Sequence, residues 1–218
     1  MSKIAILDYG MGNLRSVQKA FEHVAPDQDV LVTSDTDAVK SADRVVFPGQ
    51  GAIGGCMNLL DESGLREALM DAITNKPFLG ICLGLQALFE HSEEGGGVDM
   101  LGVMPGQVRH FGGRGVVMNG LKIPHMGWNQ VRRARRHPLW RNIGQSDWFY
   151  FVHSYYVDAA NEADIAGLTQ YGEDFVSAAA RDNVFAVQFH PEKSQHAGLQ
   201  LLKNFSKWDG DSHLPQEQ

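Results

Sequence analysis

Cysteine, positive charge and long apolar runs are all scarce in this sequence of 218 residues. The two cysteines, Cys56 and Cys82, allow one disulfide at most, which excludes a disulfide-stabilised scaffold. No apolar run approaches the ~20 residues of a membrane span, and residues 1–10 lack the apolar core of a signal peptide. We therefore expect a reduced, cytoplasmic protein that makes no contact with a membrane.

Basic residues are outnumbered, and the formal net charge is −7. Nucleic-acid-binding surfaces need an excess of cations facing the phosphates, so this charge argues against nucleic acid as a partner. The nine histidines show no spacing typical of zinc ligands. We expect neither a metal site nor a cofactor.

The first half of the chain alternates short apolar runs with helix-like segments, four times in succession. Repeated strand–helix units indicate a mostly parallel open sheet with helices on both faces, the α/β class. The expected strands are residues 3–8, 29–34, 44–49 and 76–82. The expected helices are residues 14–24, 35–43, about 53–74 and 83–92.

The second half is richer in strands joined by turns, which indicates an antiparallel extension of the same sheet. The expected strands are residues 106–111, 122–131, 148–157, 165–172, 176–182 and 184–190. A final helix, residues 194–208, has Ser194 as its expected N-cap. Residues 1–208 are predicted to form one domain, and residues 209–218 a mobile tail.

The sequence GICLG, residues 80–84, places Cys82 between two glycines at a strand-to-helix junction. This is the cysteine form of a nucleophile elbow, in which a sharp turn exposes the reactive group at the carboxyl edge of the sheet. The positive end of the following helix would favour the thiolate. Because most lone cysteines in apolar runs are buried packing residues, that alternative stands for Cys82 and is the interpretation of Cys56.

The sequence AVQFHPEKS supplies a base for this nucleophile. His190 and Glu192 are two residues apart on an extended segment, so both side chains point to the same side. Glu192 can hold the imidazole in one tautomer and stabilise its charged form, as the third member of a catalytic triad does.

Acyl transfer also needs donors for an oxyanion. The backbone N–H of Leu83, directly after the nucleophile, is one natural donor. The second is expected from the loop FPGQGA, where Gly49, Gln50 and Gly51 follow another strand that ends at the same edge.

Together, PGQGA, GICLGLQ and FHPEKS resemble the three signature regions of the class I glutamine amidotransferases, in order and over roughly residues 3–205. The resemblance implies that Cys82 attacks the side-chain amide of glutamine, that His190 protonates the departing ammonia, and that water hydrolyses the thioester. By position it also implies substrate contacts, made by Gly51, Gln86, His153, Ser154 and Tyr155.

DYGMGNLRSV, PHMGWNQV and FYFVHSYYV are more specific. They resemble glutaminase subunits that pass ammonia to a separate (β/α)8-barrel cyclase in histidine biosynthesis. The resemblance places four residues near the contact with that partner: Asn13, Trp128, Tyr150 and Lys193. Structural alternatives remain for each of them, such as an N-cap for Asn13 and core or sheet-surface packing for the two aromatic residues.

Other functions remain open on the sequence alone. The acceptor of ammonia could differ, as in surface-sugar amination, or the chain could be a stand-alone cysteine hydrolase or a non-catalytic subunit. The basic run of residues 132–136 is either a solvated loop or a docking patch for an acidic partner, and the loop is the preferred interpretation.

Overall fold

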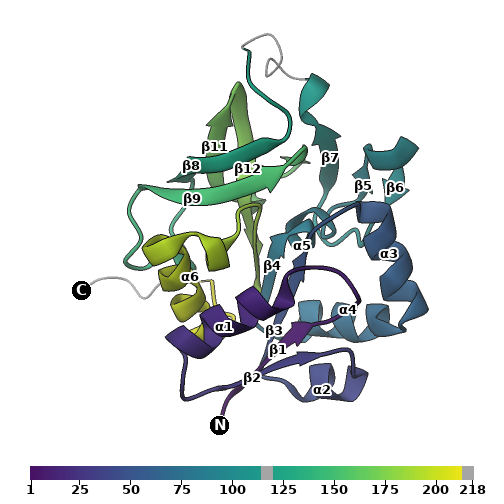
Figure 1. Ribbon diagram of the computed structural model, residues 1–218, viewed down its shortest axis with the longest axis vertical. Helices are drawn as coiled ribbons and strands as arrows, with labels where there is room; N and C mark the ends of the chain where they lie inside the picture. Colours follow the sequence, from purple (N-terminus) through teal and green to yellow (C-terminus); the bar gives the residue numbers. More distant parts are fainter. Residues whose placement is uncertain (114–119, 213–218) are drawn as a thin grey trace.

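The computed structural model describes residues 1–113 and 120–212, and within them the strands join into one 13-stranded sheet (Figure 1). The main path of the sheet runs β2-β1-β3-β4-β13-β12-β10-β7-β5-β6. A branch leaves β12 through β11 to β8 and β9.

The first five strands on this path are parallel: β2 (Asp29–Thr33), β1 (Lys3–Leu7), β3 (Arg44–Gly49), β4 (Phe78–Cys82) and β13 (Val184–Val187). All five residues of β4 are buried, as expected for a central strand covered on both faces. The parallel arrangement brings the carboxyl ends of β3, β4 and β13 to one edge. That edge holds the candidate site.

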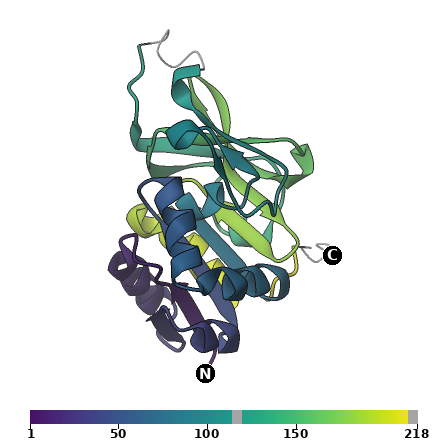
Figure 2. The same ribbon diagram turned by 90° about the vertical axis from the view of Figure 1, so that its right-hand side faces the viewer.

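Helices cover both faces of the parallel strands. Ile4 and Ile6 of β1 pack with α1 (Leu14–Val24) and α6 (Gln195–Lys207). The alternate residues Ala5 and Leu7 pack with α2 (Thr36–Ser41), α3 (Ile53–Glu62) and α4 (Leu65–Asn75), and Figure 2 shows α3 and α4 across the near face. Alternating side chains of buried strands thus build two separate cores.

The second half of the sheet is mainly antiparallel: β12 (Glu173–Arg181), β10 (Tyr155–Ala159), β7 (Gly106–His110), β11 (Ile165–Tyr171), β8 (His125–Arg133) and β9 (Ser146–His153). The two-residue strands β5 (His91–Ser92) and β6 (Val98–Asp99) end the path. The predicted fold class is confirmed. β13, which was expected in the antiparallel part, pairs parallel with β4 and antiparallel with β12, so it joins the two halves.

Three expected elements are wrong in extent. The helix expected over residues 53–74 is broken at Gly64, whose φ of 70° is left-handed. The helix expected over residues 83–92 is a single turn, α5 (Leu83–Gln86), because the carbonyls of Ala87, Leu88 and Phe89 accept from the backbone of residues 101–104 instead. The strand expected over residues 148–157 divides at Ser154 into β9 and β10.

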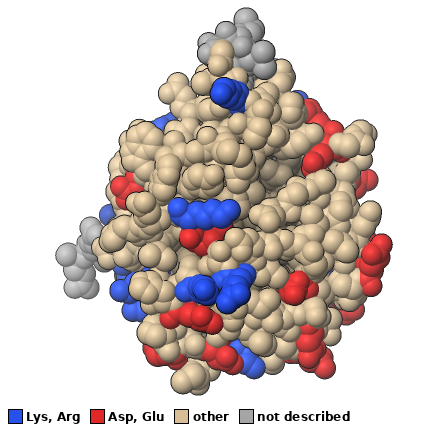
Figure 3. Space-filling model, in the orientation of Figure 1, with Lys and Arg blue, Asp and Glu red and all other residues tan. Residues whose placement is uncertain are grey.

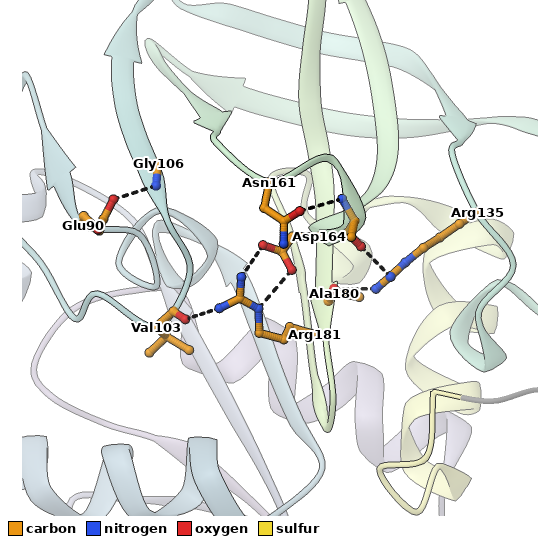
Figure 4. Close-up of polar contacts among 9 residues, drawn as sticks. Glu90, Val103, Gly106, Arg135, Asn161, Asp164, Ala180 and Arg181 are labelled. Carbon is orange, nitrogen blue, oxygen red and sulfur yellow. Dashed lines mark hydrogen bonds and ion pairs between the residues drawn. The ribbon is translucent and has the colours of Figure 1, made fainter.

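An ion pair with a buried carboxylate ties the second half together (Figure 4). Arg181, at the end of β12, donates to both carboxylate oxygens of Asp164 and, through Nη1, to the carbonyl of Val103 at 2.8 Å. Asp164 lies in the 3-10 turn η4 (Glu162–Asp164) and is 3% exposed. The pair therefore fixes one turn and one loop to the end of a central strand.

The predicted tail begins at residue 209. Asp211 accepts a hydrogen bond from the Trp208 indole at 2.7 Å, so the first tail residues fold back on α6. Residues 213–218 lie outside the described residues. In the described part of the chain, no helix is both long and apolar enough to cross a membrane.

Candidate active site

Cys82 ends β4 in a backbone conformation that non-glycine residues rarely adopt, with φ 56° and ψ −103°. Strain of this kind persists where the surroundings enforce it and is concentrated at functional sites. A Cβ atom on Gly84 would lie 1.9 Å from the Phe47 carbonyl oxygen, and one on Gly80 would lie 2.7 Å from the Gly84 oxygen. Both flanking glycines are therefore required for the sharp turn, as the elbow predicts.

The helix after the elbow contributes less than the sequence predicts. α5 has four residues, so few backbone dipoles align behind the sulfur. The electrostatic support of Cys82 has to come mainly from side chains.

His190 supplies that support from the segment directly after β13. Its Nδ1 lies 2.9 Å from Glu192 Oε1, and both side chains are almost fully buried. Burial disfavours the imidazolium, but the Cys82 sulfur and the Glu192 carboxylate outweigh it and raise the pKa of His190 to about 10. The geometry therefore favours a protonated imidazole beside the Cys82 sulfur.

Two atoms of this arrangement have no partner in the described structure, His190 Nε2 and Glu192 Oε2. Buried polar atoms are nearly always paired, so an orphan at a titratable ring indicates a group held for chemistry. The structure brings Cys82, His190 and Glu192 together, and their catalytic role remains a prediction.

Ser194 holds this segment in place. Its hydroxyl donates to the His190 carbonyl at 2.6 Å and accepts from the Tyr150 N–H at 3.0 Å. Ser194 occupies the predicted N-cap position of α6, but its side chain makes no cap bond, because its hydroxyl is used by the His190 segment instead.

The predicted oxyanion loop lies directly beside the elbow, since Gly49 pairs with Cys82 between β3 and β4. The Tyr9 hydroxyl donates to the Pro48 carbonyl at 3.1 Å and anchors the loop. A Cβ on Gly49 would lie 2.9 Å from the Leu83 Cβ, and Gly51 has φ 103°. The loop thus places the backbone of residues 49–51 close to that of Leu83, and its role as oxyanion donor stays a prediction.

Gln86 lies one turn after Cys82, and both N–H groups of its amide are used. They donate to the Tyr155 carbonyl at 3.1 Å and to Gln188 Oε1 at 3.0 Å. The predicted contact of Gln86 with substrate therefore has to use its oxygen Oε1, an acceptor for an ammonium group.

The predicted substrate strand is present, with Ser154 at the junction of β9 and β10. The His153 side chain points elsewhere, because its Nδ1 lies 2.7 Å from the Tyr155 carbonyl and its Nε2 lies 2.9 Å from His125 Nδ1. Since the Tyr155 carbonyl accepts from both His153 and Gln86, any contact between this strand and substrate must use other backbone atoms.

Sequence reasoning missed Gln188 and Glu94. Gln188 donates to the Cys82 sulfur at 3.6 Å and is fully buried. A polar residue between Val187 and Phe189 in a buried strand was the available signal. Glu94 Oε2 accepts from the Ile53 N–H at 2.8 Å, just after the oxyanion loop, and burial followed by the charge of Glu94 raises the pKa of Tyr155. No local pattern marks Glu94.

Three of the four predicted interface residues lie together behind His190. Trp128 is 42% exposed and contacts the Tyr150 ring edge-to-face, and Lys193 Nζ lies 5.9 Å from the same ring. The Tyr150 carbonyl accepts the His190 N–H at 2.9 Å. Asn13 stands at the N-cap position of α1, as that alternative had it, but its side chain makes no cap bond. It borders a cavity of about 10 Å³ that His190 and Glu192 also line.

The basic run is tied into the fold rather than free in solvent. Arg132 pairs with Asp174 at 2.7 Å, Arg133 donates to Gln145 Oε1 at 2.9 Å, and Arg135 donates to the Ala163 carbonyl at 2.6 Å. These contacts support a structural role for the run over a docking patch.

Comparison with known proteins is informative over almost the whole chain. The family model for glutamine amidotransferase class-I matches residues 5–208. The imidazole glycerol phosphate synthase subunit HisH of Nitrosospira multiformis is 57% identical over 211 residues, which cover 95% of this chain and 99% of that protein. The HisH subunit of Pseudomonas putida is 53% identical over 96% of this chain and 99% of its own length.

Solved structures agree on the fold. One glutamine amidotransferase superposes with a TM-score of 0.68 at 15% identity, covering 93% of this chain and 98% of its own. Another, from Thermotoga maritima, gives 0.58 at 16% identity and covers 94% of this chain and 82% of that one.

Proposed function

Because this chain belongs to the class-I glutamine amidotransferases, and within them to the HisH subunits of imidazole glycerol phosphate synthase, we propose that Cys82, His190 and Glu192 are its glutaminase triad. The observation that carries this proposal is the buried His190–Glu192 pair, which raises the pKa of the imidazole beside a cysteine in a strained elbow. Glutamine is the substrate, and glutamate and ammonia are the products.

The chemistry follows from the groups in place. The Cys82 thiolate attacks the amide carbon of glutamine, and the developing oxyanion is bound by backbone N–H groups of Leu83 and of the loop at Gln50 and Gly51. His190 gives its proton to the departing nitrogen, so ammonia leaves and a thioester remains. His190 then takes a proton from water, which attacks the thioester and releases glutamate.

Substrate positioning uses the two sides of the elbow. The oxygen of Gln86 and the carboxylate of Glu94 are acceptors suited to an α-ammonium group. Backbone atoms of residues 153–155 and the N–H groups near Gly51 are available for the other polar groups of glutamine. The side chains on one side thus bind the ammonium group of glutamine, and the backbone atoms on the other side bind its remaining polar groups.

The ammonia is delivered to a (β/α)8-barrel cyclase, and the pair forms imidazole glycerol phosphate and aminoimidazole carboxamide ribotide. The docking face lies around Trp128, Tyr150 and Lys193, where Met126 and Trp148 are also exposed. Figure 3 shows this face of the molecule: uncharged side chains cover most of its upper part, where β8 and β9 lie, whereas basic and acidic side chains lie together over its lower middle. A groove of about 430 Å³ lies between Trp128 and Trp148. An exposed apolar surface beside the catalytic base suits a permanent partner.

The reaction takes place in the cytoplasm, which agrees with two unpaired cysteines in the structure. A surface-sugar acceptor remains the alternative. It would leave the triad unchanged and alter only the docking face.

A glutaminase assay with and without the histidine-pathway cyclase and its acceptor tests chemistry and partner together. We expect the rate to rise when both are added, because the oxyanion loop reaches its working conformation mainly in the loaded complex. Full activity of the isolated chain would exclude this coupling, and no activity in the complex would exclude the proposed acceptor.

A further inference from the structure

Besides His190, a second set of buried polar groups reaches the Cys82 sulfur, through Gln188. Its proposed role deepens the proposed function, on which it rests. Gln188 Nε2 donates to the Cys82 sulfur at 3.6 Å, while Gln188 Oε1 accepts from Gln86 at 3.0 Å. An amide has one oxygen and one nitrogen. If Oε1 is committed to Gln86, only the N–H end can face the sulfur.

The orientation of Gln86 is fixed in turn by the Tyr155 carbonyl. This oxygen can only accept, and it lies 3.1 Å from Gln86 Nε2 and 2.7 Å from His153 Nδ1. Gln86 must therefore point its nitrogen toward both Tyr155 and Gln188. Because the Tyr155 carbonyl oxygen cannot donate, its position determines which way the amide groups of Gln86 and Gln188 point.

Two histidines extend this chain of hydrogen bonds to β8. His153 Nε2 lies 2.9 Å from His125 Nδ1, and His125 Nε2 lies 3.2 Å from the Asn129 amide nitrogen. Asn129 Nδ2 only donates, so His125 carries its proton on Nδ1. The Tyr155 carbonyl only accepts, so His153 also carries its proton on Nδ1. The Asn129 amide at one end and the Tyr155 carbonyl at the other thus lead to one consistent assignment, with the proton on Nδ1 in both histidine rings.

Both rings are neutral. Burial lowers the pKa of His125 to about 4, and burial together with the neighbouring His125 lowers that of His153 to about 3. His125 is stacked on the Tyr171 ring, with centroids 4.0 Å apart, and on Phe151 at 4.8 Å. Neither ring has room to turn.

We call this set the amide–histidine chain: Asn129, His125, His153, the Tyr155 carbonyl, Gln86 and Gln188. We propose that the amide–histidine chain fixes which end of the Gln188 amide faces Cys82, so that the sulfur meets an N–H group and never the carbonyl oxygen. Gln188 touches the reacting atom, and the other members are positioning residues.

The chemical consequence is local to the sulfur. An N–H group stabilises a thiolate, whereas a carbonyl oxygen at the same place repels it. The titratable groups that face Cys82 are His190, with Glu192 behind it, and Tyr9 across the sheet edge. Gln188 is the neutral donor among them. It supports the thiolate without competing for the proton that His190 transfers.

Alkylation of Cys82 by iodoacetamide tests this in the full chain, with the modified peptide followed by mass spectrometry across pH. Gln188→Met removes the donor at similar volume and is expected to move the midpoint of alkylation up by about 1 pH unit. Gln188→Glu places a carboxylate at the sulfur and is expected to move it further. Unchanged profiles in both variants would overturn the proposal.

His153→Phe tests the anchor, because it removes the hydrogen bond that holds the Tyr155 carbonyl in place, so this acceptor can move away from Gln86 Nε2 and release the two amide groups. We expect an upward shift in the same direction, smaller than that of Gln188→Met. His137→Phe is the matched control, since His137 is also buried with its pKa lowered to about 3, but packs on Phe185 and Trp208. Equal shifts in both histidine variants would show a general effect of destabilisation and overturn the anchor.

A measurement on the unaltered protein decides the case if a variant fails to fold. Nitrogen-15 NMR of the histidine rings is expected to show His125 and His153 both protonated on Nδ1. A proton on Nε2 of either ring would break the chain. These readouts need no glutamine, so they can fail while Cys82 still proves to be the glutaminase nucleophile, and the reverse also holds.

Discussion

Two charged pairs with buried carboxylates differ in what they leave unpaired. Arg181 and Asp164 use both carboxylate oxygens and three guanidinium nitrogens within the chain (Figure 4). His190 and Glu192 share one hydrogen bond at 2.9 Å, and His190 Nε2 and Glu192 Oε2 have no partner in the described structure. The first pair is complete, whereas the second is open toward Cys82.

The difference separates stability from chemistry. A saturated pair holds elements together, and breaking it leaves a buried charge. A pair that leaves a ring nitrogen unpaired next to a strained cysteine is suited to moving a proton. Variants of the Arg181–Asp164 pair should therefore lose stability, and variants of the His190–Glu192 pair should lose activity.

The largest effect is expected at the open site. Cys82→Ala should abolish glutamine hydrolysis, because it removes the sulfur that faces His190, while synthesis driven by added ammonia in the cyclase complex continues. The rates with glutamine and with ammonia, measured on one preparation, check this. Glutamine cleavage at the normal rate would show that Cys82 is not the nucleophile.

Asp164→Ala should act on stability instead. It leaves the partly exposed Arg181 guanidinium without its carboxylate and should lower the free energy of unfolding by about 2 kcal/mol, less than the loss of one partner of a fully buried pair. Urea denaturation measures the loss. Asp158→Ala is the control, because Asp158 pairs with Arg109 on the surface with both side chains more than 40% exposed, and that pair is worth about 1 kcal/mol or less. Equal losses would remove the distinction between the buried and the exposed pair.

Glu192→Gln sharpens the comparison through pH. Without the carboxylate, the pKa of His190 should fall from about 10 by at least about 1 pH unit, because an opposite charge at hydrogen-bond distance favours the imidazolium. The raised pKa stabilises the wild-type fold fully below the ordinary histidine value of about 6.5, and this contribution is lost as pH rises through about 10.

NMR titration of the His190 ring reads this change directly. Stability curves should show the wild-type advantage over Glu192→Gln at pH 6 and lose it by pH 10. An unchanged titration would mean that Glu192 only orients the ring.

The sequence predicts that Cys82, His190 and Glu192 lie together, because Gly-x-Cys-x-Gly and His-Pro-Glu are short contiguous motifs whose geometry is local. Their catalytic role stays a prediction. The sequence also predicts that β1, β2, β3 and β4 are parallel, because each is followed by a helical segment. It misplaces the strand that carries His190, since only tertiary pairing shows that β13 joins β4. Gln188 and the His125–His153 contact depend on residues 28 to 106 positions apart, which no local pattern reveals.

The smallest expected effect concerns the surface behind the open site. Trp128→Ala removes an exposed ring that contacts Tyr150, whose backbone holds the His190 segment. We expect affinity for the cyclase to fall about tenfold, as for an aromatic residue near the centre of an interface, with stability within about 0.5 kcal/mol of wild type. Titration calorimetry with the cyclase measures the affinity.

Trp148→Ala, on the neighbouring strand, is the matched variant. If only Trp148→Ala lowers the affinity, the docking face does not include Trp128 and its neighbour Tyr150. The partner would then have no direct contact with the segment that holds His190.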